Sequence, residues 1–160
     1  MTPSKPMSTP YASATSGMKA REEIKKVLQR FGCTEVGFSD NFAQHELLLY
    51  FKHRGRQVQV PVSAKGWAQM WLKENPWGYR HRTPRIEYEQ DALRQGLVAV
   101  NSILRDWIKG QVTAIECGIL KFEAVFLPYM LTADGSRVLD HVAPLLPKPD
   151  APKVVALPAR

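Results

Sequence analysis

Residues 46–63 read ELLLYFKHRGRQVQVPVS, and this stretch decides the fold. Leu47–Phe51 is apolar on both faces, whereas Arg56–Val62 alternates polar and apolar side chains at the period of two that is typical of a half-buried strand. Arg54-Gly55 separates the two runs, and a glycine there can take the positive φ of a tight turn. The stretch predicts a β-hairpin whose tip carries Lys52, His53, Arg54 and Arg56.

A helix and a strand are predicted before the hairpin. Apolar residues recur at helical spacing over 18–31, with Ser16 as a suitable N-cap and Gly32 as a suitable residue to end the helix. The period then changes to two over 35–39, which predicts a first strand. The outward face of the helix is expected to carry Lys19, Arg21, Lys25, Lys26 and Arg30.

Helices are predicted after the hairpin. Ser63 can cap a second helix that Asn75-Pro76 ends. From Pro84 to about Cys117 the apolar residues keep a spacing of four and three, which is the strongest periodic signal in the chain and predicts a long helix. A further short helix is expected around 121–127.

These elements predict an α+β fold: a helix, a three-stranded antiparallel sheet, a helix, then a long helix packed on the sheet and a short C-terminal helix. A chain of 160 residues suits one hydrophobic core, which we place at 18–143. Residues 1–17 are rich in Ser, Thr and Pro and suggest a flexible N-terminal arm. Residues 144–160 hold five prolines and suggest a disordered tail.

The composition and motifs of the chain limit the cellular compartment that we expect for it and the cofactors that it can use. Cys33 and Cys117 form no CxxC pair and follow no secretory signal, so we expect two buried thiols in a reducing compartment, the cytoplasm. Charged residues interrupt every long apolar run, which argues against a membrane span. We expect no cofactor and no metal, because Walker A, G-x-G-x-x-G and H-E-x-x-H motifs are all absent.

Enzyme chemistry has weak support in the sequence. There is no G-x-S-x-G motif, and Cys33 follows a helix C-terminus, where the helix dipole disfavours a thiolate. Asp40 and Glu46 flank one loop, but a metal-dependent nuclease would need more carboxylates and the E-x-K spacing on a strand. We therefore favour a protein that is not an enzyme, with an undetected activity left open.

The positive charge of the chain is confined to one region. Thirteen Lys and Arg residues lie between Lys19 and Arg85 against six acids, which accounts for the whole net charge of +7. The loop at residues 76–82, PWGYRHR, interleaves rings and guanidinium groups, the combination that single-strand binders use to stack bases and hold phosphates. A basic region of this kind is expected to face a polyanion, although a solvated surface rich in Lys and Arg remains an alternative.

The order of elements over 19–75 resembles the double-stranded-RNA-binding domain, in which the start of the second helix contacts phosphates. That resemblance implies a phosphate contact for Lys65. A second resemblance, to uncharacterised proteins of bacteriophages and prophages, covers most of the chain between the tails. It rests on YASATSG (11–17), AREEI (20–24), RFGC (30–33), HRGR (53–56), WLKENP (71–76), ECGI (116–119), FE (122–123) and FLP (126–128). It implies a phage-encoded context, in which small basic proteins act on DNA or on a host enzyme.

Two functions follow as hypotheses. The first is a nucleic-acid-binding protein, with DNA the expected polymer, in which the hairpin and the loop together hold phosphates and stack bases. Its expected site is Lys52, Arg54, Arg56, Trp77, Tyr79, Arg80, Arg82, Arg85, Lys19, Lys25, Lys26 and Lys65. The second is a protein-interaction module that inhibits or adapts a host or phage protein through the long helix or the basic face. A homodimer stays open, because a long helical stripe can also dimerise.

Overall fold

The computed structural model describes residues 8–150. In chain order the elements are α1 (Gly17–Phe31), β1 (Glu35–Asn41), β2 (Glu46–His53), β3 (Arg56–Ser63), α2 (Lys65–Glu74) and α3 (Arg85–Glu116). The C-terminal part contains α4 (Phe122–Phe126), the 3-10 turn η1 (Leu127–Tyr129), α5 (Val138–Val142) and the 3-10 turn η2 (Ala143–Leu145). The predicted α+β class and its order of elements are confirmed; α5 was not predicted.

The hairpin and its sheet form as the residue pattern predicts. The sheet is antiparallel with the order β1-β2-β3, and His53 pairs with Arg56 across the turn. Arg54 and Gly55 have φ values of 48° and 80°, the pair of positive angles that suits a two-residue turn between twisted strands. The predicted glycine turn is confirmed.

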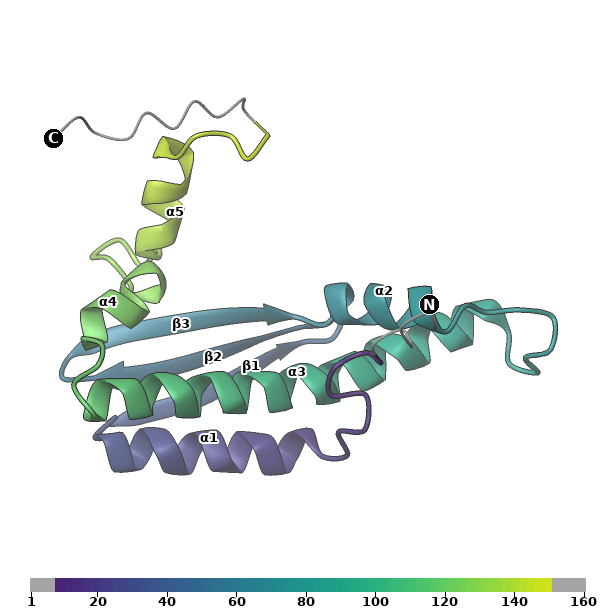
Figure 1. Ribbon diagram of the computed structural model, residues 1–160. Helices are drawn as coiled ribbons and strands as arrows, with labels where there is room; N and C mark the ends of the chain where they lie inside the picture. Colours follow the sequence, from purple (N-terminus) through teal and green to yellow (C-terminus); the bar gives the residue numbers. More distant parts are fainter. Residues whose placement is uncertain (1–7, 151–160) are drawn as a thin grey trace, which may run out of the picture.

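Helices α1 and α3 lie side by side on one face of this sheet (Figure 1), and the core lies between the two layers. The inward positions of β2 alternate with outward ones, so Leu47, Leu49 and Phe51 are buried while Leu48 and Tyr50 are only half-buried. Because none of the helices in residues 8–150 covers the opposite face along its whole length, part of the sheet is accessible among the described residues (Figure 1).

The caps of the helices set their bounds. The Ser16 side chain accepts a hydrogen bond from the Lys19 amide, and Gly32 ends α1 with a φ of 105°, as predicted. Gly118, with a φ of 73°, lies just after α3. The second helix begins at Lys65, two residues after the expected cap at Ser63, although the Ser63 hydroxyl does accept a hydrogen bond from the Lys65 amide.

The described part of the N-terminal segment lies against the helices. Thr9 is buried and donates a hydrogen bond to Glu74 of α2, and the Trp67 indole donates to the carbonyl of Pro10. The Tyr11 hydroxyl donates to Asp106 of α3. Residues 8–16 thus differ from the free arm that their composition suggests, because local composition does not reveal contacts with distant helices. Residues 1–7 lie outside the described range, as do residues 151–160 of the expected tail.

Candidate nucleic-acid interface

The turn of the hairpin presents two arginines to solvent. Arg54 and Arg56 are exposed, and neither forms an ion pair with any residue of the described chain. Lys52 lies on the accessible face of β2 and is half-buried, opposite Glu35 on β1 and Gln57 on β3. The exposed Lys121, at the start of α4, lines the same cavity as the two arginines, and sequence reasoning missed it. We call Lys52, Arg54, Arg56 and Lys121 the hairpin end.

A cavity of about 510 Å³ opens at the hairpin end. One part of its lining is apolar and comes from α1, α3 and the segment that leads into α4. Arg54, Arg56 and Lys121 supply positive charge, and Glu123 supplies one negative charge. The apolar and aromatic lining consists of Phe31, His53, Ile115, Leu120 and Phe122.

His53 has an unusual environment in this cavity. Its ring stacks on Phe31 with centroids 4.3 Å apart and an interplanar angle of 8°, and it also contacts Phe122 at 4.8 Å. The residue is only 7% exposed, and its Nδ1 has no hydrogen-bond partner within the described residues. An unpaired buried polar atom of this kind costs about 1–3 kcal/mol of stability.

Burial, together with the charge of Arg54 and against that of Glu123, lowers the pKa of His53 below its ordinary value. His53 is therefore neutral in the folded chain at neutral pH. The unpaired Nδ1 of His53 is locally unfavourable, and unfavourable local features of this kind concentrate at functional sites.

Replacing His53 by phenylalanine is expected to stabilise the fold. The variant keeps an aromatic ring beside Phe31 and removes the unpaired nitrogen, so the free energy of unfolding at neutral pH should rise by about 1 kcal/mol. Below about pH 6.5 the wild-type chain should lose stability, because the unfolded state binds the proton before the folded state does. That loss should be smaller in the variant. Urea unfolding at about pH 7.5 and about pH 5 tests this, and equal losses in both proteins would contradict it.

The loop at residues 76–84 forms a second basic cluster, ordered by its own aromatic residues. The Trp77 indole donates to the carbonyl of Thr83, and the His81 ring contacts Tyr88, whose hydroxyl donates to the carbonyl of Asn75. Tyr79 is 102% exposed, so its ring is free to stack on a ligand. We call Trp77, Tyr79, Arg80, Arg82 and Arg85 the loop end.

The arginines of the loop end differ in their partners. Arg80 and Arg82 are exposed and unpaired among the described residues, whereas Arg85 forms an ion pair with Glu89 at 3.1 Å. Trp77 is half-buried, which leaves it a smaller accessible area than Tyr79. Arg80, Arg82 and Tyr79 are therefore the best-placed ligand-binding groups at this end.

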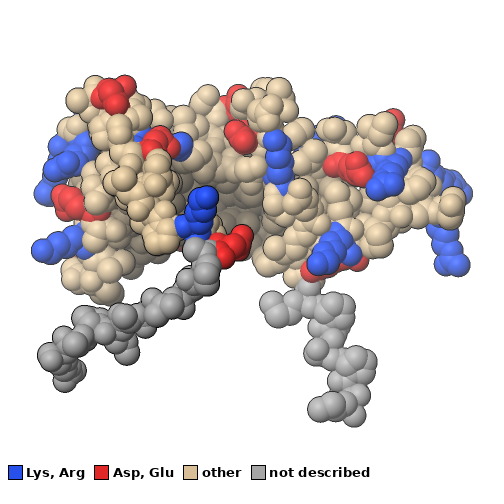
Figure 2. Space-filling model, turned by 90° about the horizontal axis from the view of Figure 1, so that it is seen from above, with Lys and Arg blue, Asp and Glu red and all other residues tan. Residues whose placement is uncertain are grey.

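The structure does not bring the two clusters together. The hairpin end lies beside Ile115 and Gly118 at the C-terminal end of α3, while the loop end leads into Arg85 at its N-terminus (Figure 1). At 1.5 Å per residue, the 32 residues of α3 separate the two ends by about 48 Å. Lys and Arg side chains gather at both ends of the elongated molecule (Figure 2). The hairpin and the loop therefore do not form one compact site, because β3 and α2 carry the chain away from the hairpin tip.

The remaining predicted contacts lie between these ends. Lys19 and Lys26 of α1 are exposed and unpaired among the described residues, while Lys25 lies 3.6 Å from Glu22. Lys65, at the start of α2, donates a hydrogen bond to Gln44.

Arg21 does not belong to the outward face of α1. Its guanidinium binds Asp40 of β1 and donates to Asn101 of α3, and it lies 4.9 Å from the ring centre of Phe38. The hydrogen bond from Arg21 also holds the pKa of Asp40 below its ordinary value. Arg21 therefore fastens the two layers of the fold together instead of facing a ligand.

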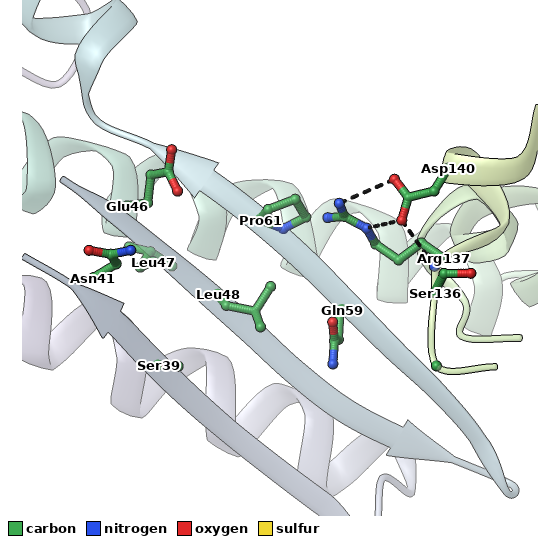
Figure 3. A pocket seen from close by; sticks show the side chains of 11 residues that line it. Ser39, Asn41, Glu46, Leu47, Leu48, Gln59, Pro61, Ser136, Arg137 and Asp140 are labelled. Carbon is green, nitrogen blue, oxygen red and sulfur yellow. Dashed lines mark hydrogen bonds and ion pairs between the residues drawn. The ribbon is translucent and has the colours of Figure 1, made fainter. Parts of the chain in front are cut away.

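A shallow hollow of about 360 Å³ lies on the accessible sheet face (Figure 3). The strands contribute Ser39, Leu48, Gln59 and Pro61 to its lining, and Arg137 reaches it from beside α5. The Arg137 guanidinium already binds Asp140, and Glu46 adds a second carboxylate to the lining, so the hollow carries a net negative charge. This hollow is therefore less suited to bind a polyanion than either basic end.

Asp134, Ser136 and His141 gather beside this hollow but do not form a catalytic triad. The Ser136 hydroxyl lies 2.5 Å from the Asp134 carboxylate and 2.6 Å from Nε2 of His141. A triad needs one ring nitrogen on the serine and the other on the carboxylate, whereas here Nε2 of His141 faces both Ser136 and, at 3.5 Å, Asp134. Hydrogen bonds from Ser136 and Thr132 lower the pKa of Asp134, so this cluster stabilises the turn at 132–136.

The cysteines and acidic residues suggest no further chemistry. Burial raises the pKa of the Cys33 thiol to about 11, which makes its thiolate scarce at neutral pH. Cys117 is exposed, so the expectation that both thiols are buried is wrong. Cys117 lies directly after the last turn of α3, where its side chain reaches solvent. Within residues 8–150, no three His, Cys, Asp or Glu side chains gather closely enough to hold a metal ion.

No helix in residues 8–150 has the length and apolar character needed to cross a lipid bilayer. Comparisons of this chain with protein-family models, with curated proteins and with solved structures find no match. The charges and rings of the two basic ends are therefore the basis for a functional proposal.

Proposed function

We propose that this chain is a phage-encoded, cytoplasmic nucleic-acid-binding protein that acts in DNA replication, recombination or regulation. The strongest support for this proposal comes from the exposure of four arginines, Arg54 and Arg56 at the hairpin end and Arg80 and Arg82 at the loop end. All four are exposed, and none has an acidic partner within the described residues. Exposed guanidinium groups without partners are the usual means of holding phosphates.

A fully exposed aromatic ring adds to this support. Tyr79 directly precedes Arg80 in sequence and offers a stacking surface for a base, a contact worth about 1–3 kcal/mol in single-strand binders. The half-buried Trp77 extends that surface, with its ring centre 6.5 Å from that of Tyr79. Lys52 and Arg85 add positive charge within the two ends, and further positive charge between the ends comes from Lys19, Lys25, Lys26 and Lys65.

Binding should weaken steeply with salt. Four phosphate contacts predict that affinity falls about 50-fold for single strands and about 150-fold for duplex DNA between about 50 and 200 mM salt. Fluorescence anisotropy with labelled single-stranded and duplex DNA and RNA measures this directly. The absence of binding to all four polymers at low salt would contradict the proposal.

The matched comparison uses two variants with different arginines or lysines removed. One replaces Arg54, Arg56, Arg80 and Arg82 by alanine. The other replaces four exposed residues that lie outside both ends, Lys73, Arg94, Lys109 and Lys148, and so matches the loss of four positive charges. Only the first variant should lose binding, and circular dichroism should confirm that both are folded.

A second candidate function is supported by the C-terminal segment. Leu139, Val142, Leu145 and Leu146 are all exposed along α5 and η2, with Leu145 at 80%. Exposed apolar residues that cluster in this way often mark a protein interface. A protein-interaction module that inhibits or adapts a host or phage protein would therefore use this segment rather than the long helix. Its association should be insensitive to salt, which separates it from nucleic-acid binding.

A further inference from the structure

We propose that the cavity at the hairpin end is a binding site for one nucleotide unit, with the base against the apolar lining and the phosphate on Arg54, Arg56 and Lys121. This inference rests on the proposed nucleic-acid-binding function and assigns it a specific pocket. The ligand class is a nucleoside phosphate, either free or as one unit of a bound strand.

The lining of the cavity favours a ligand with two different parts. Phe31, Phe122 and Leu120 form an apolar surface, while three cations lie in the same cavity. A bare phosphate would leave the aromatic surface uncovered, and a purely apolar ligand would leave three cations unpaired. A planar ring joined to an anion uses both parts. The volume of about 510 Å³ is also within the range of small-molecule sites.

His53 supplies the second, independent observation. It lines this cavity and packs against both Phe31 and Phe122, and its Nδ1 has no partner among the described residues. A neutral imidazole nitrogen needs either a donor or an acceptor, depending on its tautomer. The edge of a base carries both kinds of group close together, whereas a phosphodiester offers acceptors alone. Glu123 can accept a hydrogen bond from an exocyclic amino group at the same site.

Titration of the full chain with nucleoside monophosphates tests the pocket without a strand. The readout is the ¹⁵N signals of the His53 ring, together with the ring signals of Phe31 and Phe122. A monophosphate should shift all of them, whereas inorganic phosphate should leave the His53 ring unchanged. Unchanged His53 signals at millimolar monophosphate would overturn the inference, whether or not the chain binds a strand.

A cavity-filling variant with a matched control tests the same pocket in strand binding. Leu120 lines the cavity and is 44% exposed; Leu127 does not line it and is 47% exposed, so both accept a larger side chain at the surface. Leu120→Trp should weaken oligonucleotide and monophosphate binding by about tenfold, and Leu127→Trp should leave both unchanged.

The two outcomes separate this pocket from the wider function. If Leu120→Trp binds oligonucleotides as tightly as wild type, the nucleotide pocket is wrong while nucleic-acid binding stands. If wild type binds no oligonucleotide, the proposed function is wrong, and the monophosphate titration alone decides the pocket.

Discussion

Removing both arginines from either end should weaken nucleic-acid binding by about 30-fold, and removing all four should weaken it by about 900-fold. These values assign about 1 kcal/mol to each exposed arginine–phosphate contact. The effects should multiply because the ends lie about 48 Å apart along α3 and share no contacts. The pairs are Arg54→Ala with Arg56→Ala, and Arg80→Ala with Arg82→Ala.

The comparison also reveals how a strand lies on the protein. If a long oligonucleotide contacts both ends, each double variant should lose affinity and reduce the salt dependence. If only one double variant loses affinity, one end alone carries the site. Full affinity in the fourfold variant would contradict a role for either end.

Replacing Phe51 by alanine should lower the free energy of unfolding by about 3–5 kcal/mol, the range for buried phenylalanines. Phe51 is fully buried on β2, the central strand of the sheet, with Val36 and Val58 beside it on the neighbouring strands. Its ring also meets Phe126 of α4 edge-on at 5.3 Å, so it connects the sheet to the C-terminal part. Urea unfolding at neutral pH measures the loss.

Phe42→Ala is the matched control for this measurement. Phe42 lies in the turn between β1 and β2 and is 76% exposed, so its removal should change stability by no more than about 0.5 kcal/mol. Comparable losses in the two variants would mean that the inward face of β2 does not form the core.

The fold could be predicted largely from local signals. The alternation over 56–62, the glycine turn and the apolar spacing of α3 each depend on residues close in sequence, and each is confirmed. The equally short α4 was predicted, but the short helix α5 was not. Its capping by Arg137 and Asp140 was the available signal.

The sequence predicts which residues belong to the candidate site, but not how these residues are arranged in space. Arg56 and Arg80 are close in sequence, yet β3 covers about 26 Å and α2 a further 15 Å between them. The role of Arg21 was hidden for a related reason, because Asp40 and Asn101 come from other elements. The cavity around His53 likewise joins α1, the hairpin and α4, and no spacing in the sequence signals such a meeting.

Photo-crosslinking of a bound oligonucleotide is the most direct test of whether both basic ends contact nucleic acid. A bromodeoxyuridine strand is saturated with the full chain and irradiated, and the crosslinked peptides are identified by mass spectrometry. We expect adducts at the exposed Tyr79 of the loop end and in the peptides of the hairpin end, and we expect the matching arginine variants to lose them. Adducts confined to α5 and η2, or the absence of adducts at both the hairpin end and the loop end, would contradict a role for these ends in binding nucleic acid.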